Sequence, residues 1–184
     1  MGAFGYQQTS NGGGPLEMFR GELDASGDPI FEEVDRGAYV APPRGEYVLM
    51  VTGFSRPWEE PNKFRPGEMS KKTNLELEIV EGLGAGHKFL WSFQTFTLAM
   101  GEMPSNCGRI YSAGVLDGAR IERGKQVFFD DMIRKPFIAY VNPSDALNDK
   151  GQPKYASVAK ETIAPYRPAS EDTSYNPFKK PNAA

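Results

Sequence analysis

The chain has 184 residues, of which 39% are hydrophobic and 24% charged, and its net charge is −3. This length suits one domain. No run approaches the roughly 18 consecutive apolar residues of a membrane helix, and residues 1–14 lack the basic and apolar regions of a secretory signal, so we expect a soluble protein. The single cysteine, Cys107, cannot form an internal disulfide, which suits a reducing cytoplasm.

The charge is unevenly distributed along the chain. Residues 1–43 contain seven acidic and two basic residues, a net charge of −5, whereas residues 44–135 and residues 136–184 each carry +1. The acidic balance does not exclude a nucleic-acid partner, because only the local field over a binding site matters. It also provides no direct argument for one.

Both ends of the chain have the composition of extensions. Residues 1–43 are rich in glycine, proline and acidic residues and show no periodicity, which predicts an extended acidic arm. Residues 165–184 contain four prolines and predict a flexible C-terminal tail. The domain is therefore expected at residues 44–164. It begins with residues 46–54, whose β-branched and aromatic side chains predict a strand, followed by a long loop at 55–71.

A hairpin is predicted next. Residues 73–81 alternate between apolar and polar side chains, which predicts a half-buried strand. Its apolar face carries Leu75, Leu77 and Ile79. A glycine-rich turn at 82–86 leads into residues 87–97, which alternate again, and we expect the two strands to pair.

The second half of the domain predicts one helix and two strands. Residues 105–117 break the alternation, Ser105 is a suitable N-cap, and apolar residues recur near helical spacing. Residues 135–141 and 155–163 predict strands joined by a polar loop. The fold class is therefore predicted as mainly β: a five-stranded OB-like barrel with one helix between strands 3 and 4 and flexible N- and C-terminal arms.

Catalytic patterns are weak in this sequence. Because a strand is predicted after Gly82, Gly84 and Gly86, these glycines predict a hairpin turn rather than a phosphate-binding loop. His87 is the only histidine and Cys107 the only cysteine, too few for a protein zinc site or a recognisable nucleophile–base pair. We expect a strand-end surface histidine and no metal or other cofactor.

Three pairs of carboxylates could in principle serve acid–base or metal chemistry. They are Glu59 with Glu60, Glu76 with Glu78, and Asp130 with Asp131. Glu76 and Glu78 lie opposite the predicted apolar face, where solvated charges are ordinary, and surface roles are predicted for all six. We therefore predict a binding protein and not an enzyme.

The segment 55–72 interleaves basic and aromatic side chains. Bases of single-stranded nucleic acid stack on aromatic rings while Lys and Arg neutralise phosphates, and the loop between the first two strands of an OB-fold is a binding loop. The candidate contact residues in this segment are Arg56, Trp58, Lys63, Phe64, Arg65, Lys71 and Lys72. The alternative is a loop whose Trp58 and Phe64 fold back onto the barrel as a lid.

Three aromatic residues, Phe89, Trp91 and Phe93, alternate along one strand. Such a row can form a stacking platform, but an inward face of this composition is more often core. We predict core positions for Phe89 and Phe93. Trp91 is retained as a further candidate nucleic-acid contact, with a core position as its alternative.

Four segments give the chain a familiar pattern. They are Arg44-Gly45-Glu46-Tyr47, Leu75-Glu76-Leu77-Glu78-Ile79, the glycine-rich turn into Lys88-Phe89-Leu90-Trp91, and Lys135-Pro136-Phe137-Ile138-Ala139. Over residues 45–166 the chain resembles phage-encoded single-stranded DNA-binding proteins of the OB-fold type, found in replication and recombination modules. The resemblance implies a location in the cytoplasm of an infected bacterial host.

Many proteins of that family end in an acidic tip closing with Pro-Phe, which recruits replication partners. Glu171-Asp172 and Asn176-Pro177-Phe178 are similar to this tip, but six residues, beginning with two lysines, follow Phe178. The resemblance thus implies replication or recombination proteins as partners of the C-terminal tail, and the lysines depart from that pattern.

We therefore expect a protein that coats single-stranded DNA without strong sequence preference, in phage replication or recombination, with no membrane association and with a homo-oligomer as an open alternative to a monomer. The rival is a phage virion or assembly protein that uses the barrel for packing and its arms as clasps on neighbouring subunits. A hydrolase ranks third.

Overall fold

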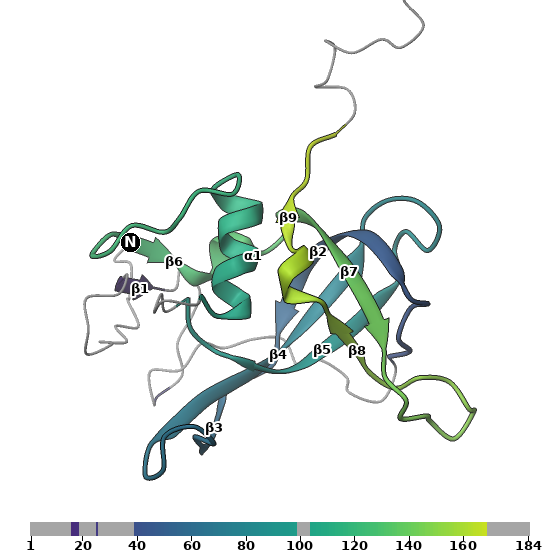
Figure 1. Ribbon diagram of the computed structural model, residues 1–184, viewed down its shortest axis with the longest axis horizontal. Coiled ribbons are helices and arrows are strands. Elements are labelled where there is room, and N and C mark those ends of the chain that lie inside the picture. The colour runs from purple at the N-terminus through teal and green to yellow at the C-terminus, as the bar shows by residue number, and fades with distance from the viewer. Residues whose placement is uncertain (1–15, 19–24, 26–38, 99–103, 169–184) are drawn as a thin grey trace, which may run out of the picture.

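The computed structural model describes residues 16–18, 25, 39–98 and 104–168 (Figure 1). Within these ranges the chain is mainly β, with a single α-helix and two short 3₁₀ helices. In chain order the elements are β1 (Leu16–Met18), β2 (Gly45–Phe54), β3 (Trp58–Pro61), β4 (Met69–Ile79), β5 (Lys88–Thr95), α1 (Asn106–Val115), β6 (Gln126–Phe128), η1 (Phe129–Met132), β7 (Pro136–Pro143), β8 (Ala156–Val158), η2 (Lys160–Thr162) and β9 (Ala164–Pro165).

One antiparallel sheet contains most of the strands. β4 pairs with β5 along one edge and with β3 and then β2 along the other. β2 also pairs with β7, and the far edge of β7 pairs with β8 and β9. β5 lies close to β8, but within the described chain no hydrogen-bonded ladder joins them. The sheet curves without closing.

The core lies inside this curved sheet and under α1 (Figure 1). The expected apolar face of β4 is confirmed, because its three residues are all at most 1% exposed. The large side chains that are buried completely are Phe54, Phe89, Phe96, Phe129, Phe137, Leu49, Leu75, Leu77, Ile79, Leu98, Ile110 and Met132.

Helix α1 begins and packs as its sequence predicts. The Ser105 hydroxyl accepts a hydrogen bond from the Gly108 N–H at 2.9 Å, which satisfies one of the free donors of the first turn. Near the other end, a Cβ on Gly114 would lie 3.0 Å from Cβ of Lys135. Glycine therefore allows the last turn of α1 to approach the segment that leads into β7.

The prediction of a long loop at residues 55–71 is wrong. Residues 58–61 form β3, which pairs with the N-terminal half of a longer β4, so the segment is a hairpin. The sequence pattern does not indicate these strands, because positions 59, 60, 71 and 72 carry charged residues, which have low strand propensity. Only residues 62–68 connect the two strands.

The end of the domain is also more broken than expected. The strand predicted at 155–163 is reduced to β8, which is followed by η2 and by β9. The Thr162 hydroxyl donates to the Ala159 carbonyl and accepts from the Tyr140 N–H. These local bonds compete with a continuous ladder and turn the chain before β9.

The domain begins before Arg44, the predicted boundary. Ala41 is buried in the core, and its N–H donates to the Pro153 carbonyl at 3.0 Å. The Val40 carbonyl lies 2.7 Å from Nε2 of His87, which is half-buried just before β5. Further upstream, β1 pairs in parallel with β6, so the expected arm contains a strand.

The packed region also extends beyond residue 164. Pro165 belongs to β9, and the Arg167 guanidinium lies 3.2 Å from the Asp117 carboxylate. The acidic and Pro-Phe segments of the tail lie outside the described residues. Among the described residues, no helix is long and apolar enough to cross a membrane.

Candidate nucleic-acid interface

The β3–β4 hairpin carries six of the eight predicted contact residues, and its turn is well defined. The Asn62 side-chain oxygen accepts from the N–H groups of Phe64 and Arg65, at 2.8 and 3.1 Å, and the Asn62 N–H donates to the Glu68 carbonyl. An Asn side chain that bonds to the following backbone mimics a turn. The turn presents Phe64, which is 95% exposed, next to the exposed Lys63.

A row of side chains crosses three strands at the base of this hairpin. Trp58 of β3 is paired with Lys72 of β4, and Lys72 is paired with Thr95 of β5. Directly paired residues project from the same face of a sheet. The Lys72 ammonium donates to the Thr95 hydroxyl at 3.1 Å, so its position over this face is defined.

Phe93 completes this face, and the prediction that it is a core residue is wrong. Its side chain is 65% exposed, and its ring meets Trp58 edge to face, with centroids 5.9 Å apart and planes at 84°. Edge-to-face pairs are a favoured aromatic geometry. Two aromatic rings therefore lie together beside Lys72.

A β-bulge explains the position of Phe93. Between the pairs Thr73–Gln94 and Leu75–Trp91, β5 has two residues where β4 has one. Phe93 has φ of +61°, uncommon for a non-glycine residue. Its N–H donates to the Asn74 side-chain oxygen at 3.1 Å. The buried positions shift at this point, from Phe89 and Trp91 of β5 to Gln94 and to Phe96 just after the strand.

Buried polar groups hold the bulge. The Asn74 N–H donates to the Ser55 hydroxyl at 2.8 Å, and the Thr73 hydroxyl donates to the Ser55 carbonyl at 2.8 Å. Ser55, Thr73 and Asn74 are each at most 6% exposed. A buried polar network with its hydrogen bonds satisfied rigidifies its surroundings, so the Phe93 backbone is anchored from below.

The hairpin and β5 enclose an open pocket of about 450 Å³. It is lined by Glu60, Pro61, Asn62, Lys63, Phe64, Ser70, Lys72, Phe93 and Thr95. These residues include two lysines and one glutamate, so the formal charge of the lining is +1. We call this pocket, together with Trp58, the hairpin site.

The eight predicted contact residues divide into groups. Lys63, Phe64 and Lys72 line the hairpin site, and Trp58 contacts Phe93 beside it. The four that lie elsewhere are Arg56, Arg65, Lys71 and Trp91. Arg56 is exposed in the connection between β2 and β3, and Arg65 pairs with Glu68 at 3.5 Å. Lys71 lies on the opposite face of β4 from Lys72.

Trp91 is a core residue and not a surface contact. It is 5% exposed, pairs with Leu75, and belongs to the buried cluster. The lid alternative is wrong for Phe64, which is almost fully exposed. Phe93, which sequence reasoning missed, carries no local signal, because a bulge at a phenylalanine depends on pairing with a distant strand.

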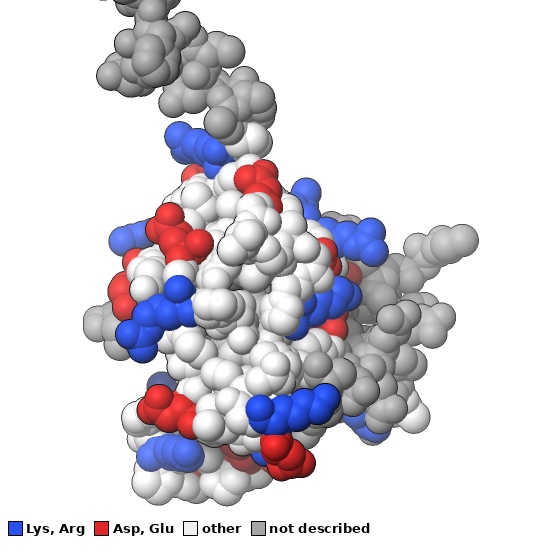
Figure 2. Space-filling view, turned by 90° about the vertical axis from the view of Figure 1, so that its right-hand side faces the viewer, with Lys and Arg blue, Asp and Glu red and all other residues white. Residues whose placement is uncertain are grey.

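Outside the hairpin site, the described residues include no recognisable reactive or metal-binding group. Cys107 is buried in the core, and its thiol lies 3.4 Å from the Thr95 carbonyl. No group of three or more His, Cys, Asp or Glu side chains that could hold a metal occurs among the described residues. Elsewhere on the surface, the face on the right of Figure 1 carries interspersed basic and acidic side chains (Figure 2).

Glu76 differs from the solvated carboxylate that was predicted. Its side chain is 14% exposed and accepts hydrogen bonds from Thr52 at 2.6 Å, from Lys88 at 3.1 Å and from the Tyr39 hydroxyl. Burial raises the pKa of this carboxyl, but the bonds from Thr52, Tyr39 and Lys88 outweigh burial and leave the pKa below its ordinary value of 4.5. Glu76 therefore ties residue 39 to the sheet.

Comparison with known proteins identifies no relative. No protein-family model, no curated protein and no solved structure matches this chain. The interpretation of the hairpin site therefore depends on its own chemistry.

Proposed function

We propose that this chain binds single-stranded DNA without strong sequence preference, at the hairpin site. The observation that carries the proposal is an exposed Phe93 ring, held against Trp58 on an anchored bulge, next to Lys72 and Lys63. Nucleobases would stack on Phe93 and Phe64, and the two lysines would neutralise phosphates. Stacking of this kind accepts any base, because every base has a π face.

The strand order supports an OB-like interpretation of the fold. β2, β4, β5, β7 and β8 would be the five strands of a partly open barrel, with α1 between the third and the fourth. The hairpin site then lies on the connection between the first two strands, which is a binding loop in that fold. This interpretation and the site chemistry are independent arguments for the same ligand.

The proposal requires no catalytic group and no cofactor. In its fullest form the chain coats DNA exposed during phage replication or recombination in a bacterial host, with the C-terminal tail as the contact to other replication proteins. That wider role rests on the resemblance to phage single-stranded DNA-binding proteins and on the C-terminal pattern of that family.

A fluorescence-anisotropy titration with a labelled oligonucleotide tests the proposal. We expect the logarithm of the affinity to fall linearly with the logarithm of salt concentration, with a slope of about −0.7 for each phosphate neutralised. Duplex of the same sequence should bind more weakly, because its bases cannot stack on the protein. Equal affinity for duplex and single strand would remove the stacking mechanism.

Phe93→Ala is the decisive variant. It should cost roughly 1–3 kcal/mol of oligonucleotide affinity, the usual value of one base stack, with little loss of stability because the side chain is mostly exposed. Leu83→Ala is the matched control, since Leu83 is an exposed apolar residue, 98% accessible, in the β4–β5 turn. Equal losses in the two variants would contradict a specific role for Phe93.

The assembly alternative is favoured by one observation. β1 pairs only with β6 among the described strands, in a two-stranded sheet apart from the main one. The same strand from a neighbouring copy could make this pairing, as in arm exchange between subunits. Light scattering of the full chain and of a chain lacking residues 1–38 distinguishes the alternatives: loss of an oligomer on truncation favours assembly.

A further inference from the structure

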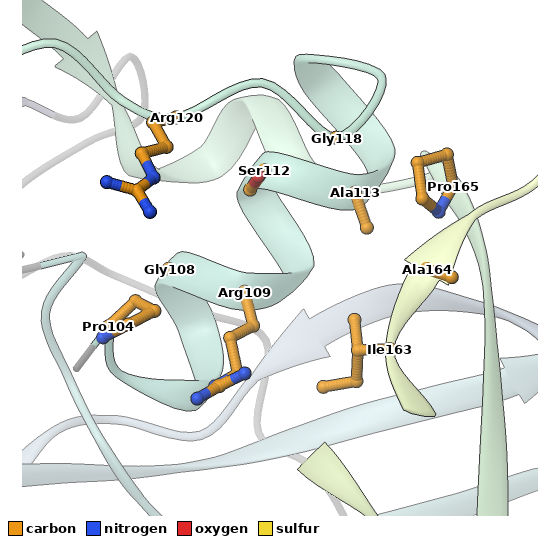
Figure 3. A pocket seen from close by; sticks show the side chains of 10 residues that line it. All are labelled: Pro104, Gly108, Arg109, Ser112, Ala113, Gly118, Arg120, Ile163, Ala164 and Pro165. Atoms are coloured by element: carbon orange, nitrogen blue, oxygen red, sulfur yellow. The ribbon is translucent and has the colours of Figure 1, made fainter. Parts of the chain in front are cut away.

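A second pocket lies between α1 and the C-terminal strand β9, with a volume of about 360 Å³ (Figure 3). It is lined by Pro104, Gly108, Arg109, Ser112, Ala113, Gly118, Arg120, Ile163, Ala164 and Pro165. Small side chains of α1 form its floor. We call it the helix pocket.

Two arginines give the helix pocket its charge. Neither the Arg109 nor the Arg120 guanidinium makes a hydrogen bond or an ion pair within the described chain, and Nε of Arg109 is buried without an acceptor. A buried donor without a partner is unfavourable, and no carboxylate lines the pocket. By contrast, the nearby Arg167 and Lys125 are paired with Asp117 and Glu122.

This arrangement fits an extended anion. Guanidinium groups bind phosphate and carboxylate oxygens through paired N–H donors. In Figure 3 the two arginines stand at separate parts of the rim, while Ile163, Ala164 and Pro165 form the opposite wall. A nucleic-acid strand, which carries anionic groups along its length, can meet both arginines.

The helix pocket is also connected to the hairpin site. The first turn of α1 is bonded to the end of β5, through Asn106 Nδ2 to Gln94 Oε1 at 2.6 Å and through the Cys107 thiol to the Thr95 carbonyl. Thr95 lines the hairpin site, and Arg109 follows Cys107 by two residues on the same helix. These two contacts link the surfaces that carry the two pockets.

We propose that the helix pocket binds backbone phosphates of the same single strand, as a second contact beyond the hairpin site. Arg109 and Arg120 neutralise the phosphates, and the small residues of α1 leave room for the sugar–phosphate backbone of the DNA. The DNA strand contacts the hairpin site first and the rim of the helix pocket further along its length. This inference rests on the proposed function.

The test compares Arg120→Ala with Arg123→Ala. Both residues are exposed arginines after α1, but Arg123 does not line the pocket. Affinities are measured by anisotropy with oligonucleotides of roughly five and roughly twenty nucleotides, because single domains of this kind cover about 4–16 nucleotides. Arg109→Gln provides a second variant, with circular dichroism to verify folding.

We expect Arg120→Ala and Arg109→Gln to weaken binding of the long oligonucleotide several-fold and to flatten its salt slope by about 0.7 for each phosphate that is no longer neutralised. The short oligonucleotide should bind as before, and Arg123→Ala should change neither. Three results would overturn the inference: no effect of either pocket variant, an equal effect of Arg123→Ala, or an equal loss with the short oligonucleotide.

Two further outcomes separate the possibilities. Tighter DNA binding by Arg120→Ala would overturn the inference, because it would mean that an anionic segment of the protein itself occupies the pocket. If the unaltered chain binds neither oligonucleotide, the proposed function fails and the inference fails with it. If the chain binds both and only the pocket variants are silent, the inference fails and the hairpin site stands alone.

Discussion

At the scale of single residues, Phe93 projects outward, although Phe89 and Trp91 of the same strand are buried. A left-handed backbone at a bulky residue costs of order 1–3 kcal/mol and persists only where its surroundings hold it. Here the Asn74 side chain bonds to the Phe93 N–H from within a buried network. An aromatic ring held outward at such a position is consistent with a binding role, whereas Trp91 fills the core.

Trp91→Ala should therefore act on folding and not on the site. Removing a buried tryptophan leaves a cavity and should cost about 3–5 kcal/mol of the free energy of unfolding. Urea denaturation measures this loss. Fluorescence-anisotropy titration of the folded variant should give an unchanged affinity for the oligonucleotide. Trp91→Phe, with a smaller cavity, serves if the alanine variant does not fold. A fully stable Trp91→Ala that binds DNA weakly would show that Trp91 is a contact.

Glu76 predicts a pH dependence of stability. Because its folded-state pKa lies below the ordinary 4.5, its contribution is present above pH 4.5 and is lost as pH falls through the folded value. Glu76→Gln should therefore destabilise the protein at neutral pH, and the difference from the unaltered chain should shrink in acid, below the folded-state pKa. Denaturation curves under the two conditions measure it. A difference independent of pH would mean that the carboxylate charge contributes nothing.

At the scale of elements, the β3–β4 hairpin separates two adjacent lysines. Lys72 lies over the hairpin site beside Thr95, and Lys71 projects from the other face of β4. A hairpin that extends from a sheet offers two different faces to solvent, so charge composition alone does not locate a binding surface.

Lys72→Ala should flatten the salt slope of oligonucleotide binding by about 0.7, the value of one phosphate contact on a single strand. Lys71→Ala, its neighbour in sequence, should leave the slope nearly unchanged. Anisotropy titrations over a series of salt concentrations measure both slopes. If both variants flattened the slope equally, the bound DNA strand would cross both faces of the hairpin rather than follow the face that carries Lys72.

At the scale of the whole molecule, the packed domain includes the segment before β2. Ala41 enters the core, Val40 meets His87, and the Tyr39 hydroxyl bonds to Glu76. These contacts fasten Tyr39 to β4, Val40 to the end of the β4–β5 turn, and Ala41 to the core. The boundary of the stable unit therefore lies near residue 39 on the N-terminal side.

Two truncations test this boundary. Removing residues 1–38 should cost the β1–β6 pairing and leave the main sheet nearly unchanged. Removing residues 1–43 should lower the thermal midpoint further, because it exposes the core beneath Ala41 and releases the partners of Glu76 and His87. Scanning calorimetry of the two chains measures the difference. Equal midpoints would place the boundary at Arg44, where composition predicts it.

Local chemistry in the sequence determined much of this architecture. The hairpin of β4 and β5, the strand β7 and the helix capped by Ser105 all follow from periodicity and capping, which act between residues close in the chain. Segment 55–72 gathers aromatic and basic residues in the sequence, and three of its predicted contact residues, Lys63, Phe64 and Lys72, line the hairpin site.

Only the tertiary structure decided which of these side chains meet. The bulge that turns Phe93 outward arises where β5 pairs with β4 around Asn74, and strict alternation in the sequence cannot reveal an inserted residue. The docking of residues 39–41 and the walls of the helix pocket likewise depend on partners that are distant in the chain. Periodicity sets which residues can face inward, and long-range pairing sets where that pattern shifts.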